Sequence, residues 1–74
     1  MKDRVKSIIS EILNIPVDVI DDNSDIIEKY GADSLDAADL VLEFEKVFGF
    51  TVPDEDAVEL RTVSKIVNYI QDNK

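Results

Sequence analysis

Apolar residues recur at three- and four-residue spacing along three stretches of this chain, and this spacing is typical of helices packed on one side against a core. The stretches cover residues 3–14, 36–48 and 63–70. No stretch shows the strict alternation of a half-buried strand. The residues expected in the core are Val5, Ile8, Ile9, Ile12 and Leu13 in the first stretch, Ala37, Leu40, Val41, Phe44, Val47 and Phe48 in the second, and Val63, Ile66, Val67 and Ile70 in the third.

Prolines and glycines predict where these helices end. Pro16 disfavours helical geometry in the residue before it, so we expect the first helix to end near Asn14. Gly49 can adopt the left-handed conformation that ends a helix. Pro53 is followed by three acidic residues, which favours a short helix over residues 54–60. The apolar residues that this short helix offers for burial are Ala57, Val58 and Leu60.

The predicted fold is therefore all-α, a small antiparallel bundle of four helices, three longer and one short. A long loop over residues 17–30 joins the first and second helices, and its isoleucines and valines are expected to pack on the core. Residues 1–74 are expected to form a single domain, since a chain of this length holds one small core.

The loop contains one spacing that resembles part of a calcium-binding loop. Asp21, Asn23 and Asp25 match the first three ligand positions of an EF-hand. The match then fails, because Ile26 replaces the required glycine and Ala32 stands where a bidentate glutamate is needed. A polar turn is therefore favoured over a calcium site, and we expect no metal site in the chain.

Composition limits the chemistry that the chain can perform. It lacks cysteine and histidine, so it has no thiolate nucleophile and lacks the commonest general base, and we expect no catalysis by the polypeptide itself. Its net charge is −9, and fourteen of the seventeen acidic residues lie in positions 18–59. This charge argues against nucleic acid or anionic membrane as a partner and favours basic protein surfaces. With no apolar run suited to a signal peptide or membrane span, we expect a cytoplasmic protein.

The start of the second long helix carries the candidate functional residue. Asp33 is a good N-cap, Ser34 occupies the first helical position, Asp36 adds a carboxylate to the first turn, and Gly31 supplies a flexible entry. Backbone N–H groups at a helix start attract anions. A phosphate carried on Ser34 is therefore well placed.

The opposite face of the same helix combines leucines with charges. At 100° per residue Leu35 and Leu42 project outward together, beside acidic side chains. Apolar anchors surrounded by charges suit a surface that binds other proteins. The charged neighbours are Asp36, Asp39, Glu43 and Lys46.

With these features, the chain resembles the acyl carrier proteins of fatty acid and polyketide synthesis over essentially its whole length. The resemblance implies that Ser34 bears 4′-phosphopantetheine, transferred from coenzyme A by a separate synthase, and carries acyl intermediates as thioesters among fatty acid synthesis enzymes. Asp33 and Asp36 are expected to help position that synthase or its metal. The matching motif is Gly31-Ala32-Asp33-Ser34-Leu35-Asp36, followed by Asp39-Leu40-Val41.

The resemblance also implies a partner surface and a monomeric carrier. Basic patches of partner enzymes are expected to dock on residues of the second helix and the short third helix. These residues are Asp36, Asp39, Leu42, Glu43, Glu45, Asp54 and Asp56.

The sequence departs from the common family pattern at two places and leaves other functions open. Lys46 and Val47 interrupt a run that is often acidic, and Tyr30 replaces an aliphatic residue. The alternatives are a carrier for polyketide, lipid acylation or aminoacyl and peptidyl pathways, or an unmodified acidic helical module that binds other proteins.

Overall fold

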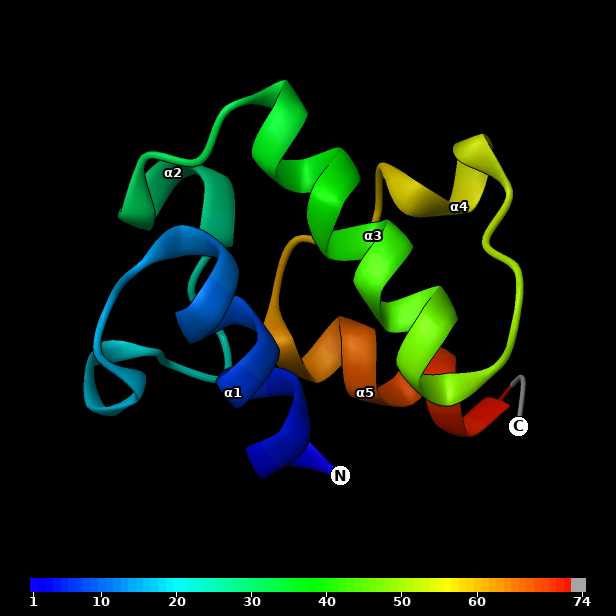
Figure 1. Ribbon diagram of the computed structural model, residues 1–74, viewed down its shortest axis with the longest axis horizontal. Helices are drawn as coiled ribbons and strands as arrows, with labels where there is room; N and C mark the ends of the chain where they lie inside the picture. Colours follow the sequence, from blue (N-terminus) through cyan, green and yellow to red (C-terminus); the bar gives the residue numbers. More distant parts are fainter. Residues whose placement is uncertain (73–74) are drawn as a thin grey trace.

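The computed structural model describes residues 1–72, which form five α-helices, one 3₁₀ turn and no strand (Figure 1). The predicted all-α fold is confirmed. None of these helices is both long enough and apolar enough to cross a membrane. In chain order the elements are α1 (Lys2–Leu13), η1 (Val17–Val19), α2 (Ile26–Tyr30), α3 (Ser34–Phe48), α4 (Asp54–Ala57) and α5 (Val63–Asp72).

The core lies where α1 packs against both α3 and α5. Its side chains are aliphatic except for Phe44, which is 1% exposed, and every one of the three long helices contributes through its predicted apolar face. The connection between α1 and α3 adds Ile20 and Ile26, as expected for a connection rich in apolar residues. The buried cluster consists of Val5, Ile8, Ile9, Ile20, Ile26, Leu40, Phe44, Val63, Ile66 and Ile70.

The connection expected to be irregular contains a helix that the sequence pattern did not reveal. The carboxylate of Asp25 caps α2 by accepting hydrogen bonds from the N–H groups of Ile27 and Glu28. Gly31 ends the helix in the left-handed conformation, with φ of 70°. Five residues are too few to show a helical period, so only the cap and the glycine marked this helix in the sequence.

Helix α4 is shorter than the predicted helix over residues 54–60. It ends at Ala57, and a looser turn follows, in which the N–H of Leu60 donates to the Ala57 carbonyl at 3.1 Å. The expectation that Val58 is buried is wrong, since Val58 is 70% exposed. Val58 keeps helical backbone angles, with φ of −66° and ψ of −17°, but at 100° per residue its side chain points in a different direction from that of Ala57.

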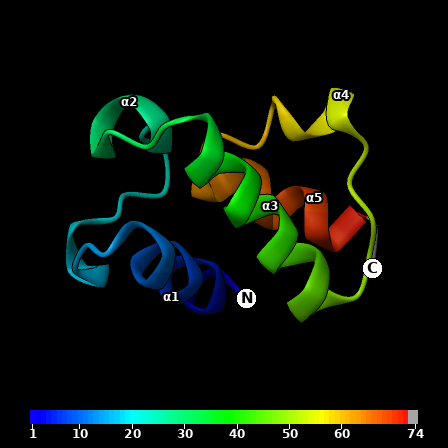
Figure 2. The same ribbon diagram turned by 45° about the horizontal axis from the view of Figure 1, so that its top comes forward.

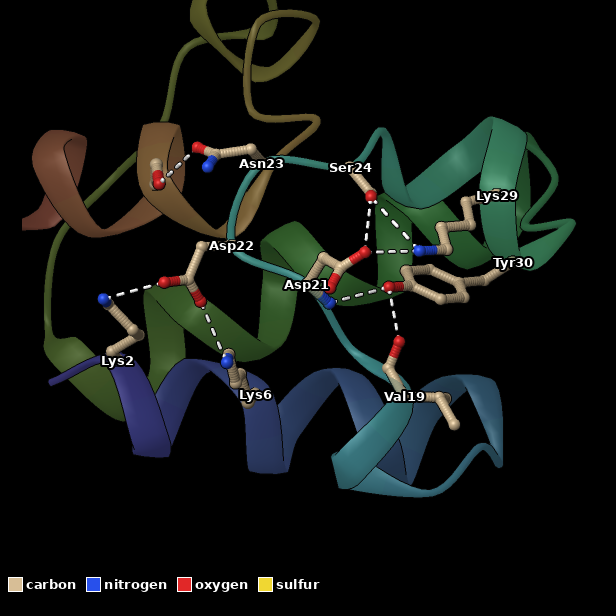
Figure 3. A network of polar contacts seen from close by, with 10 residues as sticks. Lys2, Lys6, Val19, Asp21, Asp22, Asn23, Ser24, Lys29 and Tyr30 are labelled. Carbon is tan, nitrogen blue, oxygen red and sulfur yellow. Dashed lines mark hydrogen bonds and ion pairs between the residues drawn. The ribbon is translucent and has the colours of Figure 1, made fainter.

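Polar contacts fix the connection to both neighbouring long helices (Figure 3). The Asp22 carboxylate accepts from Lys2 at 2.8 Å and Lys6 at 2.9 Å, both on α1. The Asp22 carbonyl accepts from the N–H of Ser64 on α5, and the Ser64 hydroxyl bonds to the side chain of Asn23 at 3.2 Å. The connection thus joins α1 to the start of α5.

The Tyr30 hydroxyl joins the end of the connection between α1 and α3 to its beginning. This hydroxyl donates to the Val19 carbonyl and accepts from the Asp21 N–H, each at 2.9 Å. The Asp21 carboxylate also pairs with Lys29 and accepts from Ser24 (Figure 3). The tyrosine that departs from the family pattern therefore holds the two ends of this segment together.

The three side chains with calcium-loop spacing are engaged in these contacts. Asp21 pairs with Lys29, Asn23 bonds to α5, and Asp25 caps α2. Across residues 1–72 no three histidine, cysteine, aspartate or glutamate side chains form a group that could hold a metal ion.

Replacing Asp22 with asparagine should destabilise the fold in a way that depends on pH. Hydrogen bonds from Lys2 and Lys6 hold the pKa of Asp22 below its ordinary value of 3.8. The unfolded chain therefore binds the proton more readily, so this stabilisation is present above pH 3.8 and is lost as the pH falls towards the lowered folded pKa. Urea unfolding of the wild type and Asp22→Asn should show a gap at neutral pH that closes on acidification.

Asp18→Asn is the matched control, because Asp18 is exposed and forms no ion pair within residues 1–72. It should unfold like the wild type at every pH. A gap for Asp22→Asn that acidification leaves unchanged would contradict the ion-pair explanation.

Candidate functional site

The turn that begins α3 is held by a capping box. Asp33 is extended, with φ of −98° and ψ of −175°, and its carboxylate accepts from the Asp36 N–H at 2.9 Å. The Asp36 carboxylate accepts in return from the Asp33 N–H at 3.4 Å. The predicted N-cap is confirmed, and Ser34 is the first residue of a fifteen-residue helix.

Ser34 presents a free hydroxyl at this turn. Its side chain is exposed and forms no hydrogen bond with any residue from 1 to 72. The N–H groups of Ser34 and Leu35 also have no acceptor in that range, as expected at the start of a helix. The turn therefore combines an accessible oxygen with backbone donors and the positive end of the helix dipole.

Within residues 1–72, no side chain near Ser34 is arranged to remove its proton. The neighbouring carboxylates of Asp33 and Asp36 are occupied by the capping box, and the chain contains no histidine. A serine nucleophile needs a bonded general base. This hydroxyl can be a point of attachment, but it lacks the partners of a catalytic serine.

A groove begins beside Ser34 and follows one side of α3. Its volume is about 750 Å³, and the opposite wall is the segment from Val52 to Arg61, which includes α4. In Figures 1 and 2, α4 lies on the far side of α3 from α1. Most of the lining is aliphatic, and the α3 wall consists of Ser34, Ala37, Ala38, Leu40, Val41, Leu42, Phe44 and Glu45.

Hydrogen bonds attach the wall from Val52 to Arg61 to the rest of the protein at both of its ends. Near α2, the Ile26 N–H donates to the Arg61 carbonyl at 2.7 Å, and the Arg61 side chain pairs with Asp25 at 2.8 Å. At the other end, the Val52 N–H donates to the Glu45 carboxylate at 2.7 Å. The wall that carries α4 is thus attached to the body of the protein at both ends.

Helix α4 itself has little apolar anchorage, because none of its side chains is buried. The Asp56 carboxylate accepts a hydrogen bond of 2.7 Å from the Tyr69 hydroxyl on α5, and this bond raises the pKa of Tyr69 above its ordinary value of 10.0. The Tyr69 ring also packs on Phe50, with centroids 5.9 Å apart. Polar and aromatic contacts with α5 hold this wall in place.

Three large apolar side chains are exposed around the site. Leu35 is 76%, Leu42 60% and Val58 70% exposed, and the last two line the groove. The sequence pattern indicated the two leucines but not Val58. Its only signal in the sequence was a large apolar residue two positions after the run of acids that starts the short helix.

The predicted partner-recognition acids differ in exposure and in bonding. Asp39 and Asp54 are exposed, whereas Asp36 and Glu43 are half-buried. The carboxylates of Glu45 and Asp56 are half-buried and bonded to the groove wall and α5 respectively, which a helical wheel could not show.

Comparison with known proteins finds a matching family model and two similar sequences. Residues 3–70 match the family model described as the phosphopantetheine attachment site. The acyl carrier protein of Wolinella succinogenes is 39% identical over 72 residues, covering 97% of this chain and 95% of that protein. The acyl carrier protein of Chlamydia caviae is 41% identical over 71 residues, covering 96% of this chain and 92% of that protein.

The structure is also similar to that of the acyl carrier protein from Enterococcus faecalis. The TM-score is 0.85 at 37% sequence identity, and the match covers 99% of this chain and 92% of that chain.

Removing the cap of α3 should destabilise the fold without affecting the core. Asp33→Ala leaves the Asp36 N–H without its acceptor, which should lower the free energy of unfolding by about 1 kcal/mol. Asp33→Asn keeps a side-chain oxygen at the same place and should remain close to the wild type. Urea unfolding measures both variants, and an equal loss for alanine and asparagine would contradict a capping role.

Proposed function

This chain belongs to the acyl carrier protein family, and from that premise we propose that Ser34 is the residue that bears the 4′-phosphopantetheine arm. The observation that carries the proposal is the exposed, unbonded Ser34 hydroxyl at the start of α3, beside an apolar groove. The unpaired N–H groups of Ser34 and Leu35 suit an attached phosphate. The residues present therefore fit the group that the family carries.

The protein's own contribution is to present and support Ser34. When attached, the arm supplies a terminal thiol to which acyl groups are joined for fatty acid synthesis. Asp33 and Asp36 keep the first turn of α3 formed, so the attachment oxygen stays at a fixed place on the surface. Since no base is bonded to the hydroxyl, a separate synthase has to activate it. We therefore assign the chain a carrier role without catalysis of its own.

The groove beside Ser34 is the proposed shelter for the acyl chain. Its volume of about 750 Å³ and its aliphatic lining suit a saturated hydrocarbon chain, whose burial removes apolar surface from water. Since α4 has no buried side chain, this wall can shift at little cost to the core. The cargo would lie between α3 and the segment from Val52 to Arg61.

The proposed docking surface for partner enzymes surrounds the same groove. Leu35, Leu42 and Val58 provide exposed apolar anchors. Acidic side chains of α3 and α4 supply the negative field that attracts basic patches and sets the register of docking. From the predicted set we place Asp36, Asp39, Leu42, Glu43 and Asp54 at this surface, while the bonded carboxylates of Glu45 and Asp56 support the groove wall.

We further propose that the protein acts as a cytoplasmic monomer in which residues 1–74 form one domain. A single buried cluster shared by α1, α3 and α5 supports one folding unit. The alternatives of another carrier pathway or an unmodified binding module are outcomes of the experiments below.

The attachment site is tested by intact mass. The wild type, Ser34→Ala and Ser7→Ala are incubated with coenzyme A and a carrier-protein synthase. Ser7 is the control because it is an exposed helical serine with no hydrogen bond in residues 1–72. One phosphopantetheinyl increment is expected on the wild type and Ser7→Ala, and none on Ser34→Ala. No increment on any protein, under conditions that modify a known carrier, would favour the unmodified binding module.

The docking surface is tested by binding of the same synthase. Leu42→Ala should weaken the complex roughly tenfold, corresponding to about 1.4 kcal/mol for an apolar anchor. Asp39→Asn should mainly slow association, and this effect should shrink as salt is added. Glu11→Gln is the control, because Glu11 is exposed on α1 outside the proposed docking surface, and this variant should bind like the wild type. Unchanged binding by Leu42→Ala would rule out this helix face as the docking site.

A further inference from the structure

Of the charged residues that line the groove, one on α3 lies at the end away from the attachment point. Glu45 is the last α3 residue that lines the groove, eleven positions after Ser34. At 1.5 Å per residue, about 16 Å of helix separates the two. Between them the α3 wall consists of alanines, valine, leucines and a phenylalanine. The groove therefore runs from a polar entrance along an apolar wall to a carboxylate.

The Glu45 carboxylate is held across this end of the groove. Its Oε2 accepts a hydrogen bond of 2.7 Å from the N–H of Val52, which is only 7% exposed. The bond spans from α3 to the opposite wall, so the carboxylate cannot turn away without leaving a buried donor unpaired.

The charge of Glu45 has no cationic partner within residues 1–72. The acidic side chains with ion pairs there are Asp21, Asp22, Asp25 and Glu43. Glu45 is half-buried, so its charge depends on the water that still reaches it. A hydrocarbon chain that advanced against it would strip this water away, and an unpaired buried charge is costly.

From this geometry we propose that Glu45 is a specificity-determining residue whose fixed charge ends the groove and limits how much of an acyl chain the protein shelters. The inference rests on the proposed function, since it requires the groove to receive the chain attached through Ser34. Methylenes between Ser34 and Glu45 replace water on aliphatic walls, which is favourable. Methylenes beyond that point meet a carboxylate and remain in solvent.

The test uses a series of saturated acyl groups of increasing length, loaded through the arm onto the wild type and Glu45→Gln. Glutamine removes the charge but keeps an oxygen that can accept from Val52 N–H. The melting temperature of the wild type should rise with each added pair of carbons and then level off at a limiting length. In Glu45→Gln the rise should continue to longer chains before it levels.

Glu11→Gln is the matched control. It makes the same substitution on α1, where the side chain is exposed, does not line the groove and lies outside the proposed docking surface. Its limiting length should equal that of the wild type. An equal limiting length in the wild type and Glu45→Gln would overturn the inference while leaving the carrier function intact.

A second measurement needs only the wild type. A ¹⁹F or ¹³C label on the terminal carbon should report a buried environment up to the limiting length and a solvent environment beyond it. A terminal label that stays buried in longer chains would overturn the inference.

If chains are loaded but the melting temperature never rises, the proposed shelter fails and the inference fails with it. If no chain is loaded, the attachment site itself is wrong, which intact mass shows separately.

Discussion

The burial of Leu40 and Phe44 fixes the rotation of α3 about its axis, and the arrangement of the site depends on that rotation. Successive residues of a helix are 100° apart, so once these two side chains are buried in the cluster shared with α1 and α5, every other direction is determined. Ser34 then lies at an exposed turn, the alanines and Val41 face the groove, and Leu42 lies at its exposed edge. A rotation by one residue would bury polar side chains and remove the groove wall.

Within residues 1–72, most ion pairs lie in the connection between α1 and α3 rather than on α3 itself. The cations Lys2, Lys6, Lys29 and Arg61 pair with aspartates of the connection between α1 and α3. Over the same residues, 1–72, the single ion pair on α3 is the exposed contact of Lys46 with Glu43. The connection is thereby held by ion pairs, while the surface around the groove keeps a negative electrostatic potential.

The sequence predicted those features that depend on neighbouring residues. The apolar period identified α1, α3 and α5, and the short spacing of Asp33, Ser34 and Asp36 identified the cap and the exposed serine. Helix α2 was not predicted, because five residues cannot show a helical period. The hydrogen-bond partners of Glu45 and Asp56 were not predicted either. Val52, after α3, and Tyr69, on α5, come from other parts of the chain, and a helical wheel carries no information about other elements.

Because α4 has no buried side chain, the residues that determine the fold largely differ from those that form the outer wall of the groove. Folding is encoded by the cluster that α1, α3 and α5 share, whereas part of the outer wall of the groove is formed by a short helix that buries no side chain. Substitutions at Asp54, Glu55 and Ala57 leave the hydrogen bond between Asp56 and Tyr69 in place and can therefore accumulate with little loss of stability. In engineering terms α4 is an exchangeable part, through which the lining of the groove can be redesigned on an unaltered scaffold.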